Sequence, residues 1–310
     1  MRVLRLTNGA GSPALVSETA AEPHPSKQEL LVRVCAAGII PTELGWYPTW
    51  HTKSGANRSG AIPAHEFCGV VAAIGEEVGG LELGREVFGM NDWFSDGALA
   101  EYCVAPFSSV APRPSTLTHA EAASVPISAL TAWQGLLDRA KLQPGERVLI
   151  HGGAGGVGCF AVQLAHMNGC HAIATASAAN AAFVRELGAE QVIDYRSSPF
   201  EQQTSGVDVV FDTVGGDVLE RSWSVLRSGG RLVTVVSSAE QSTDPRVKAA
   251  FFIVEPNHKQ LSIIGGMLDS RKLRAVVDTT ITLTRAAEAY AGRAPGIHRG
   301  KVVVTIAGEN

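Results

Sequence analysis

The feature that most constrains the fold of this chain is a glycine-rich stretch directly after a short apolar segment. In RVLIHGGAGGVGCFAVQLAHMN, the apolar residues 148–150 suit a strand that is buried on both faces. Five of the residues 152–158 are glycine, and apolar residues then recur at helical spacing from Val157 to Ala165. Strand, glycine-rich turn and helix, in this order, form the context that a dinucleotide-binding fingerprint requires.

The glycines of this stretch fit the pattern G-x-G-x-x-G at Gly153, Gly155 and Gly158. The first allows a tight turn, the second lets the backbone approach a pyrophosphate, and the third lets the helix pack closely on the strand. The free N–H groups of the helix would then face the phosphates. The alternative is a glycine-rich turn between strand and helix that holds no ligand.

Composition and charge limit the class of protein. The 310 residues suffice for two domains, and the formal net charge of −4 gives no support for nucleic-acid binding. Because the N-terminus lacks the apolar segment of a signal peptide and no apolar run could span a bilayer, we expect a cytoplasmic protein without a membrane partner. The five cysteines have wide spacing and no CxxC pair, so we expect buried, reduced thiols: Cys35, Cys68, Cys103, Cys159 and Cys170.

Two kinds of pattern divide the chain. Residues 1–118 carry short segments rich in β-branched residues and punctuated by glycines, for example 30–36, 70–74 and 98–105, which indicate a barrel-like or sandwich-like β unit. In residues 119–270 strand and helix signals alternate, as in a doubly wound parallel sheet. A capping box, Thr118 with Glu121, opens this part. Residues 271–310 are too few to stand alone and are expected to complete the first domain, so the predicted fold class is α/β.

The residues after the second strand of the parallel sheet indicate which dinucleotide is bound. NAD sites carry an acidic residue roughly 20 residues after the fingerprint, which binds the ribose hydroxyl. Residues 159–185 contain no Asp or Glu, and a neutral segment admits a 2′-phosphate. Ser177, Asn180, Tyr195 and Arg196 could contact it, so NADPH is favoured over NADH. The alternative for Ser177 is an ordinary helix cap.

Several motifs resemble those of the medium-chain dehydrogenase/reductases, and in particular of their zinc-independent, quinone oxidoreductase-like (zeta-crystallin-like) branch. They occur in the family's order over nearly the whole chain: LTAWQGL, LQPGERVL, HGGAGGVG, ELGAEQVIDYR, VFDTVGG and GKVVV. The resemblance implies a GroES-like β-barrel domain, a Rossmann domain, an active site in the cleft between them and a homodimer.

The resemblance also assigns cofactor-binding residues, where this sequence matches the family's motifs. Ser177 and Tyr195 match contacts to the 2′-phosphate, and Asn180 stands where many relatives carry lysine. The remaining positions match the nicotinamide end, the pyrophosphate loop, the turns after the fourth and fifth strands and a segment near the carboxamide: Thr131, Gly153, Ala154, Gly155, Gly156, Val157, Gly158, Val214, Gly215, Val236, Ser237, Ser238, Phe252, Ile253 and Val254.

Alcohol dehydrogenases of this superfamily hold a catalytic zinc, and the matching stretches here lack most of its ligands. Ile40 replaces the first cysteine, His65-Glu66 is retained, and residues 125–133 offer no cysteine. Since catalytic zinc generally needs three protein ligands, we expect no metal and interpret His65 as a hydrogen-bonded structural histidine. Relatives without zinc often carry Asn at the position of Ile40, so this end of the pocket is expected to be apolar.

These features together predict an NADPH-dependent, metal-free reductase of a quinone or an α,β-unsaturated carbonyl compound. The charge that develops on the conjugated oxygen needs hydrogen-bond donors or a proton source. Tyr47 is the favoured proton donor, although packing of a long loop is the alternative for this aromatic cluster. The expected substrate pocket consists of Ile40, Trp46, Tyr47, Trp50, His51, Asn91 and Trp93.

Two other classes of function remain open at this point. The first is a zinc-dependent alcohol dehydrogenase with unusual ligands, which metal analysis and chelator sensitivity would reveal. The second is a non-enzymatic NADPH-binding protein, which would bind the cofactor tightly without oxidising it in the presence of quinones, enals or enones.

Overall fold

A computed structural model describes residues 1–9, 12–296 and 298–306. The chain forms two compact units. The first consists of Met1–Ile127, Pro256–Ile297 and Lys301–Asn310, and the second of Ser128–Glu255 and His298–Gly300. None of the helices in the described ranges has the length and apolar character needed to cross a membrane.

The first unit is built on a seven-stranded sheet in the order β13-β14-β3-β4-β5-β7, with β6 also paired to β3. All pairs are antiparallel except β13 with β14. The strands are β3 (Glu29–Gly38), β4 (Glu66–Ile74), β5 (Glu86–Met90), β6 (Tyr102–Pro106), β7 (Val110–Pro112), β13 (Val277–Thr282) and β14 (Lys301–Thr305). A hairpin of β1 (Arg2–Gly9) and β2 (Ser12–Thr19) accompanies them.

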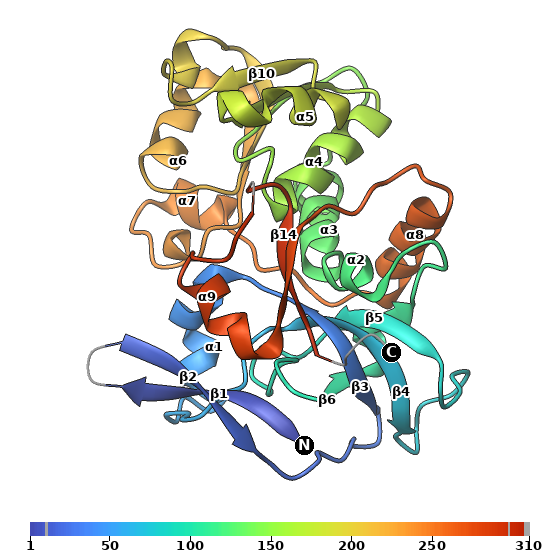
Figure 1. The fold of residues 1–310 in the computed structure, drawn as a ribbon. Coiled ribbons are helices and arrows are strands. Elements are labelled where there is room, and N and C mark those ends of the chain that lie inside the picture. Colours follow the sequence, from blue (N-terminus) through green and yellow to red (C-terminus); the bar gives the residue numbers. More distant parts are fainter. Residues whose placement is uncertain (10–11, 297, 307–310) are drawn as a thin grey trace. The chain divides into compact units, whose positions relative to one another are not determined.

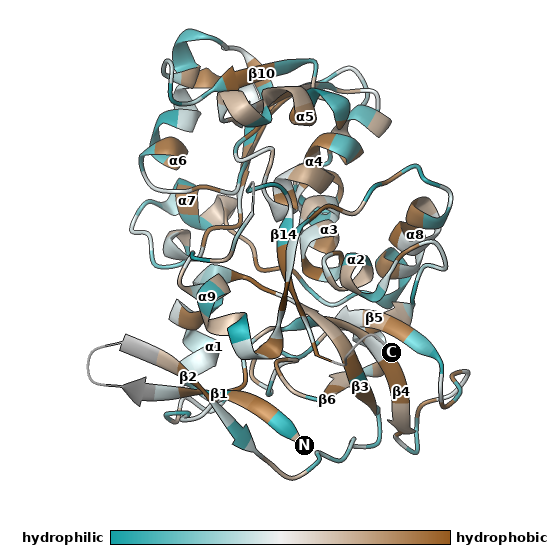
Figure 2. Cartoon of the chain, in the orientation of Figure 1, coloured by the Kyte–Doolittle hydropathy of each residue, from teal (hydrophilic) through white to brown (hydrophobic). Residues whose placement is uncertain are grey.

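Hydrophobic residues are concentrated on β3 and β4, the two central strands of this sheet (Figure 2). Eight of the ten residues of β3 are buried, and Val32 and Phe67 belong to one continuous core. The helical segments of this unit are η1 (Pro41–Gly45), α1 (Tyr47–Trp50), η2 (Phe107–Ser109), α2 (His119–Ala123), α8 (His258–Asp269), η8 (Leu283–Arg285) and α9 (Ala286–Tyr290). Helix α2 starts at the predicted capping box, since the Thr118 and Glu121 side chains cap each other's backbone N–H groups.

The second unit is a five-stranded parallel sheet in the order β10-β9-β8-β11-β12, which confirms the predicted α/β class (Figure 1). Its strands are β8 (Arg147–Ile150), β9 (His171–Ala176), β10 (Gln191–Asp194), β11 (Val207–Asp212) and β12 (Leu226–Thr234). The helices that connect or extend them are α3 (Pro126–Trp133), the π-helical η3 (Gln134–Arg139), α4 (Gly156–Met167), η4 (Ala178–Asn180), α5 (Ala181–Glu186), η5 (Phe200–Gln202), α6 (Asp217–Ser222), η6 (Trp223–Val225), η7 (Ser237–Ala239) and α7 (Pro245–Ala250).

Two details differ from the sequence-based expectations. The expected strand over 98–105 begins only at Tyr102, because the N–H groups of Ala98 and Leu99 donate to the carbonyls of Ala64 and Pro63 in a loop. The domain bounds also differ: residues 119–127 and 256–270, expected in the Rossmann domain, cluster with the first unit, whereas His298–Gly300, expected in the first domain, clusters with the second. The ring of His258 bonds to the Val110 carbonyl, and Asp269 accepts the backbone N–H of Thr116.

Candidate functional site

Within the second unit, the carboxyl ends of all five strands lie along one edge of the parallel sheet. Ile150 of β8 pairs with Ala174 of β9 and with Phe211 of β11, and the outer strands continue this register. Turns that follow the ends of parallel strands therefore meet at this edge, where open α/β sheets bind their ligands. The expected cofactor residues in these turns are Gly153–Gly158, Ser177, Asn180, Tyr195, Val214, Gly215 and Val236–Ser238.

The glycine-rich loop leads from β8 into α4 in a conformation that needs its glycines. A Cβ atom added to Gly158 would lie 2.0 Å from the carbonyl oxygen of Gly152, so α4 could not approach the loop as closely with any other residue. At Gly155, the N-cap of α4, an added Cβ meets protein only at 3.4 Å. The loop is thus tightly packed toward the protein at Gly158 and open at Gly155, which fits a pyrophosphate at the N-terminus of a twelve-residue helix.

Buried polar side chains, which the sequence analysis did not assign, hold the turns of this edge in place. The carboxylate of Asp212, at the end of β11, accepts the N–H groups of Val214 and Gly215, each at 3.0 Å, and the hydroxyl of Thr234 at 2.8 Å. Thr175 accepts the N–H of Gly152 at 3.1 Å. Because Asp212 is wholly buried and fully engaged, it positions the turns after β11 and β12. In the sequence, the one indication of this role is that Asp212 belongs to the VFDTVGG motif.

The turns after β9 and β10 carry the residues that were expected to contact a 2′-phosphate. Ser177 is the N-cap residue of η4, but its side chain makes no capping hydrogen bond there. Tyr195 is exposed, and the Arg196 guanidinium lies 5.5 Å from the centre of its ring. Asn180 is buried and bonds to residues near the C-terminus of the chain, a partner that local sequence could not reveal.

Two further segments of the expected cofactor site lie next to each other within the same unit. Gln134, just after the helix that carries the buried Thr131, exchanges two hydrogen bonds with the backbone of Glu255, at 2.8 and 3.0 Å. Glu255 directly follows the expected segment Phe252–Val254, in which the side chains of Phe252 and Val254 are buried and that of Ile253 is half exposed.

In the first unit, His65 belongs to a buried network of acids and their partners. Its Nδ1 lies 2.9 Å from Oε2 of Glu43, whose carboxylate also accepts the Ala64 N–H at 3.2 Å and the hydroxyl of Tyr290. His65 is therefore hydrogen-bonded, as expected, and its purely structural role stays a prediction. Burial, followed by the charge of Glu43, raises the pKa of Tyr290 well above its ordinary value, so this hydroxyl is a donor to Glu43.

The neighbouring Glu66 is paired with a lysine from the last strand. It is wholly buried, and its Oε1 bonds to Nζ of Lys301 while its Oε2 accepts the Ile127 N–H at 2.9 Å. Burial raises the pKa of the Glu66 carboxyl, and the charge and hydrogen bond of Lys301 oppose that rise. The two residues expected from the zinc-binding pattern, His65 and Glu66, are thus each held by another side chain of the protein.

The aromatic residues of the expected substrate pocket form separate contacts. Trp46 and Trp93 pack edge-to-face at 5.4 Å, with the His65 ring also 5.4 Å from Trp93. Tyr47 stacks on His51 at 4.0 Å and is 53% exposed. The other three expected residues take no part in these ring contacts. Trp50 donates to the Leu44 carbonyl, Asn91 is buried and donates to the Val104 carbonyl, and Ile40 is half-buried just before η1.

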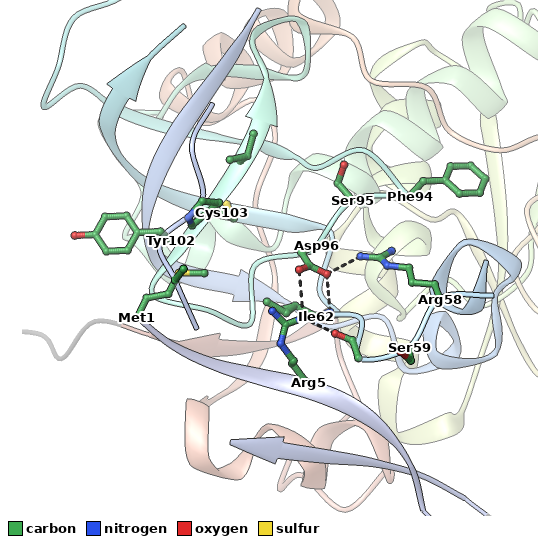
Figure 3. Close-up of a pocket in the computed structure, with 15 residues that line it drawn as sticks. Met1, Arg5, Arg58, Ser59, Ile62, Phe94, Ser95, Asp96, Tyr102 and Cys103 are labelled. Atoms are coloured by element: carbon green, nitrogen blue, oxygen red, sulfur yellow. Dashed lines mark hydrogen bonds and ion pairs between the residues drawn. The ribbon is translucent and has the colours of Figure 1, made fainter. Parts of the chain in front are cut away.

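The first unit contains a pocket of about 440 Å³, which is lined by residues other than those expected to bind the substrate (Figure 3). Its polar part is formed by Arg5 and Arg58, which both reach Asp96, at 3.4 and 2.6 Å. Asp96 also accepts the Ile62 N–H at 3.1 Å. None of the seven expected substrate residues lines this pocket, and its arginines are already ion-paired, both with Asp96 and Arg5 also with Glu18. We therefore do not assign the substrate to it.

The donors of the zinc-binding pattern do not fit a catalytic zinc. Ile40 offers no ligand atom, and the two oxygens of Glu66 are bonded to Lys301 and to the Ile127 N–H, so the pattern retains one donor, His65, of the three that a catalytic zinc needs. Over residues 1–9, 12–296 and 298–306, no three His, Cys, Asp or Glu side chains are grouped so that they could hold a metal ion. All five cysteines are buried and free, as expected, and burial raises the pKa of the Cys103 thiol to about 12, which keeps it protonated.

Comparison with known proteins agrees with this architecture. The zinc-binding dehydrogenase family model matches residues 187–304, and the alcohol dehydrogenase GroES-like domain model matches residues 26–115. The chain is 32% identical to 2-methylene-furan-3-one reductase of Solanum lycopersicum, over 92% of this chain and 73% of that protein. It is 28% identical to a chloroplastic quinone-oxidoreductase homolog of Spinacia oleracea, over 96% and 95% of the two chains.

A solved structure gives the same result for the fold. The quinone oxidoreductase of Coxiella burnetii superposes with a TM-score of 0.88 at 30% identity, over 99% of both chains. Fold, glycine-rich loop and relatives define an oxidoreductase of the class that uses a nicotinamide cofactor. The chain belongs to the medium-chain dehydrogenase/reductase superfamily, in its quinone oxidoreductase-like branch.

Proposed function

We propose that this protein is an NADPH-dependent oxidoreductase that reduces a quinone or an α,β-unsaturated carbonyl compound without a metal ion. The observation that carries the proposal is the composition of the carboxyl edge of the parallel sheet. An open glycine-rich loop follows β8, and the turn after β9 holds Ser177 and Asn180 with no carboxylate. A carboxylate there would bind the ribose hydroxyl of NAD and repel a 2′-phosphate, so its absence favours NADPH.

The class of substrate is supported by what two relatives act on. A 2-methylene-furan-3-one and a quinone both contain a carbon–carbon double bond conjugated to a carbonyl group, and these compounds appear in the names of the relatives from Solanum lycopersicum and Spinacia oleracea. When bound, NADPH supplies the hydride. Charge that reaches a conjugated oxygen is delocalised, so a Lewis-acid metal is less necessary than for a simple alcohol or aldehyde.

The absence of a metal is proposed from the way in which the acids of the first unit are used. A catalytic zinc needs three protein ligands, whereas Ile40 supplies none and the two oxygens of Glu66 are bonded to Lys301 and to the Ile127 N–H. The exposed hydroxyl of Tyr47, stacked on His51, is the proposed proton donor or carbonyl hydrogen bond. Its exposure leaves it accessible to a substrate, unlike Tyr290, whose hydroxyl is bonded to Glu43.

A spectrophotometric screen tests this function. Purified protein is mixed with NADPH or NADH and with a quinone, a 2-alkenal or a cyclic enone, before and after dialysis against a chelator. We expect NADPH consumption with at least one conjugated acceptor, slower turnover with NADH, and no effect of the chelator. Stoichiometric zinc with chelator-sensitive turnover would contradict the metal-free proposal. Tight NADPH binding without oxidation by any acceptor would indicate a non-enzymatic protein.

A further inference from the structure

The segment His298–Gly300 belongs to the parallel-sheet unit although it comes from near the end of the chain. The N–H of Gly300 donates to the carbonyl of Ala154 at 2.8 Å, and Gly300 pairs with Gly155 as an isolated parallel bridge. Both partners belong to the glycine-rich loop. Arg299 is therefore fixed, by the backbone of its neighbour, beside the edge of the sheet at which the phosphates are expected.

The side chain of Arg299 is oriented by the turn after β9. Its Nε donates to Oδ1 of Asn180 at 2.8 Å, and its Nη2 donates to the Ala179 carbonyl at 3.1 Å. Asn180 in turn donates from Nδ2 to the His298 carbonyl at 3.3 Å. The guanidinium lies 4.9 Å from the centre of the Phe183 ring. A buried asparagine and an aromatic ring thus fix the orientation of the guanidinium, so less side-chain entropy is lost when it binds a ligand.

Charge favours an anion at this place. Arg299 reaches the turn that contains Ser177, and register puts Tyr195 and Arg196 directly after the neighbouring strand, since Asp194 pairs with Ala176. No Asp or Glu occurs between Cys159 and Arg185. Arginine binds phosphate through parallel N–H donors, and an arginine near the second strand accommodates the 2′-phosphate in NADP-dependent Rossmann domains.

We propose that Arg299, positioned by Asn180, recognises the 2′-phosphate of NADPH and so determines the choice of dinucleotide. This inference rests on the proposed function, because it assigns a residue to the NADPH preference. It also gives Asn180 a role different from a direct phosphate contact: Asn180 is a positioning residue, and the cation that contacts the phosphate comes from a segment 119 positions later in the chain.

The test compares two ligands that differ only in the phosphate of interest, adenosine 2′,5′-bisphosphate and 5′-AMP, by isothermal titration calorimetry. Loss of a charge-assisted bond lowers affinity about 10- to 100-fold, so we expect Arg299→Met to weaken the bisphosphate by that factor and to leave 5′-AMP unchanged. Arg299→Lys should retain part of the difference, and Asn180→Ala should lose part of it. Arg185→Met, at an exposed arginine of α5, is the matched control and should change neither affinity.

The outcomes separate this inference from the function on which it rests. If the wild-type protein binds both ligands equally, the proposed NADPH preference is wrong and the role of Arg299 with it. If the wild type prefers the bisphosphate and Arg299→Met keeps that preference, only the role of Arg299 is wrong. An equal loss of both affinities in Arg299→Met and Arg299→Lys would show that Arg299 merely holds the C-terminal segment in place.

Discussion

His151, the residue between β8 and the glycine-rich loop, is a buried histidine whose two ring nitrogens face hydroxyl groups. Its Nε2 lies 2.9 Å from Oγ of Ser222, and its Nδ1 lies 3.3 Å from Oγ1 of Thr175. Ser222 donates its own proton to the Val218 carbonyl, so it accepts from Nε2–H, and Thr175 is left to donate to Nδ1. This pattern suits the neutral ring, and burial lowers the pKa of His151 to about 4.

The low pKa of His151 predicts a loss of stability in mild acid. Between pH 6.5, its ordinary pKa, and about 4, the unfolded chain binds a proton at this residue and the folded protein does not. The contribution to stability is therefore complete above pH 6.5 and decreases as the pH falls to about 4, by about 3 kcal/mol at most. Urea unfolding at a series of pH values should show a smaller acid loss for His151→Gln than for the wild type. Identical pH slopes would contradict this assignment.

The pair of Glu66 and Lys301 predicts a large effect from a single substitution. Lys301→Met leaves the Glu66 carboxylate buried without its counter-ion, which should destabilise the protein by about 3–5 kcal/mol. Without the charge and hydrogen bond of Lys301, burial should raise the pKa of Glu66 further. The variant should therefore recover stability as the pH falls and Glu66 is protonated. Urea unfolding measures both effects.

The double variant Lys301→Met/Glu66→Gln is the control for that experiment. It removes the charge but keeps an acceptor for the Ile127 N–H, so it should regain most of the lost stability. A double variant no more stable than Lys301→Met would show that lost packing of the lysine side chain, and not the unpaired carboxylate, causes the destabilisation.

At the scale of the element, two glycines of the loop between β8 and α4 are predicted to have different roles: Gly158 is needed for folding, and Gly155 for binding of the dinucleotide. Gly158→Ala places a methyl group against the Gly152 carbonyl, so we expect destabilisation by more than about 2 kcal/mol, together with loss of dinucleotide binding. Gly155→Ala meets protein only at 3.4 Å and should fold normally, yet its methyl group should hinder the pyrophosphate and lower the affinity for NADPH. Thermal unfolding and calorimetric titration of both variants provide the two readouts.

The two glycine variants would contradict the account if their effects were exchanged. A Gly155→Ala variant that binds NADPH as tightly as the wild type would mean that the phosphates do not approach this part of the loop. A stable Gly158→Ala variant would mean that α4 can move away from β8 without cost.

Regular elements with strong local signals could be predicted from the sequence. The glycine-rich loop, the capping box of Thr118 and Glu121, and the alternation of strand and helix all depend on residues close together in the chain. The ends of elements were harder to predict. β12 starts at Leu226, four residues before the expected Gly230, because its pairing with β11 begins there and then shifts register at a bulge. Local patterns carry no information about such pairings.

At the scale of the whole molecule, what sequence reasoning missed comes from long-range contacts. Glu43 meets Tyr290 across 247 positions, and Glu66 meets Lys301 across 235. No periodicity or spacing connects such residues, so the network around His65 and the contact of Arg299 with Asn180 appeared only in the structure. The substrate is hardest to predict for a related reason: its expected residues lie in an irregular segment whose side chains make contacts as varied as those of Trp46, Tyr47 and Asn91.

For an α,β-unsaturated carbonyl substrate, the proposed function requires that hydride be added to the β-carbon and not to the carbonyl carbon. The most direct test reduces a cyclic enone with NADPH deuterated at the transferred position and locates the deuterium in the product by NMR. We predict a saturated ketone with deuterium on the β-carbon. An allylic alcohol with deuterium on the carbon that bears oxygen would contradict the account and indicate an alcohol dehydrogenase.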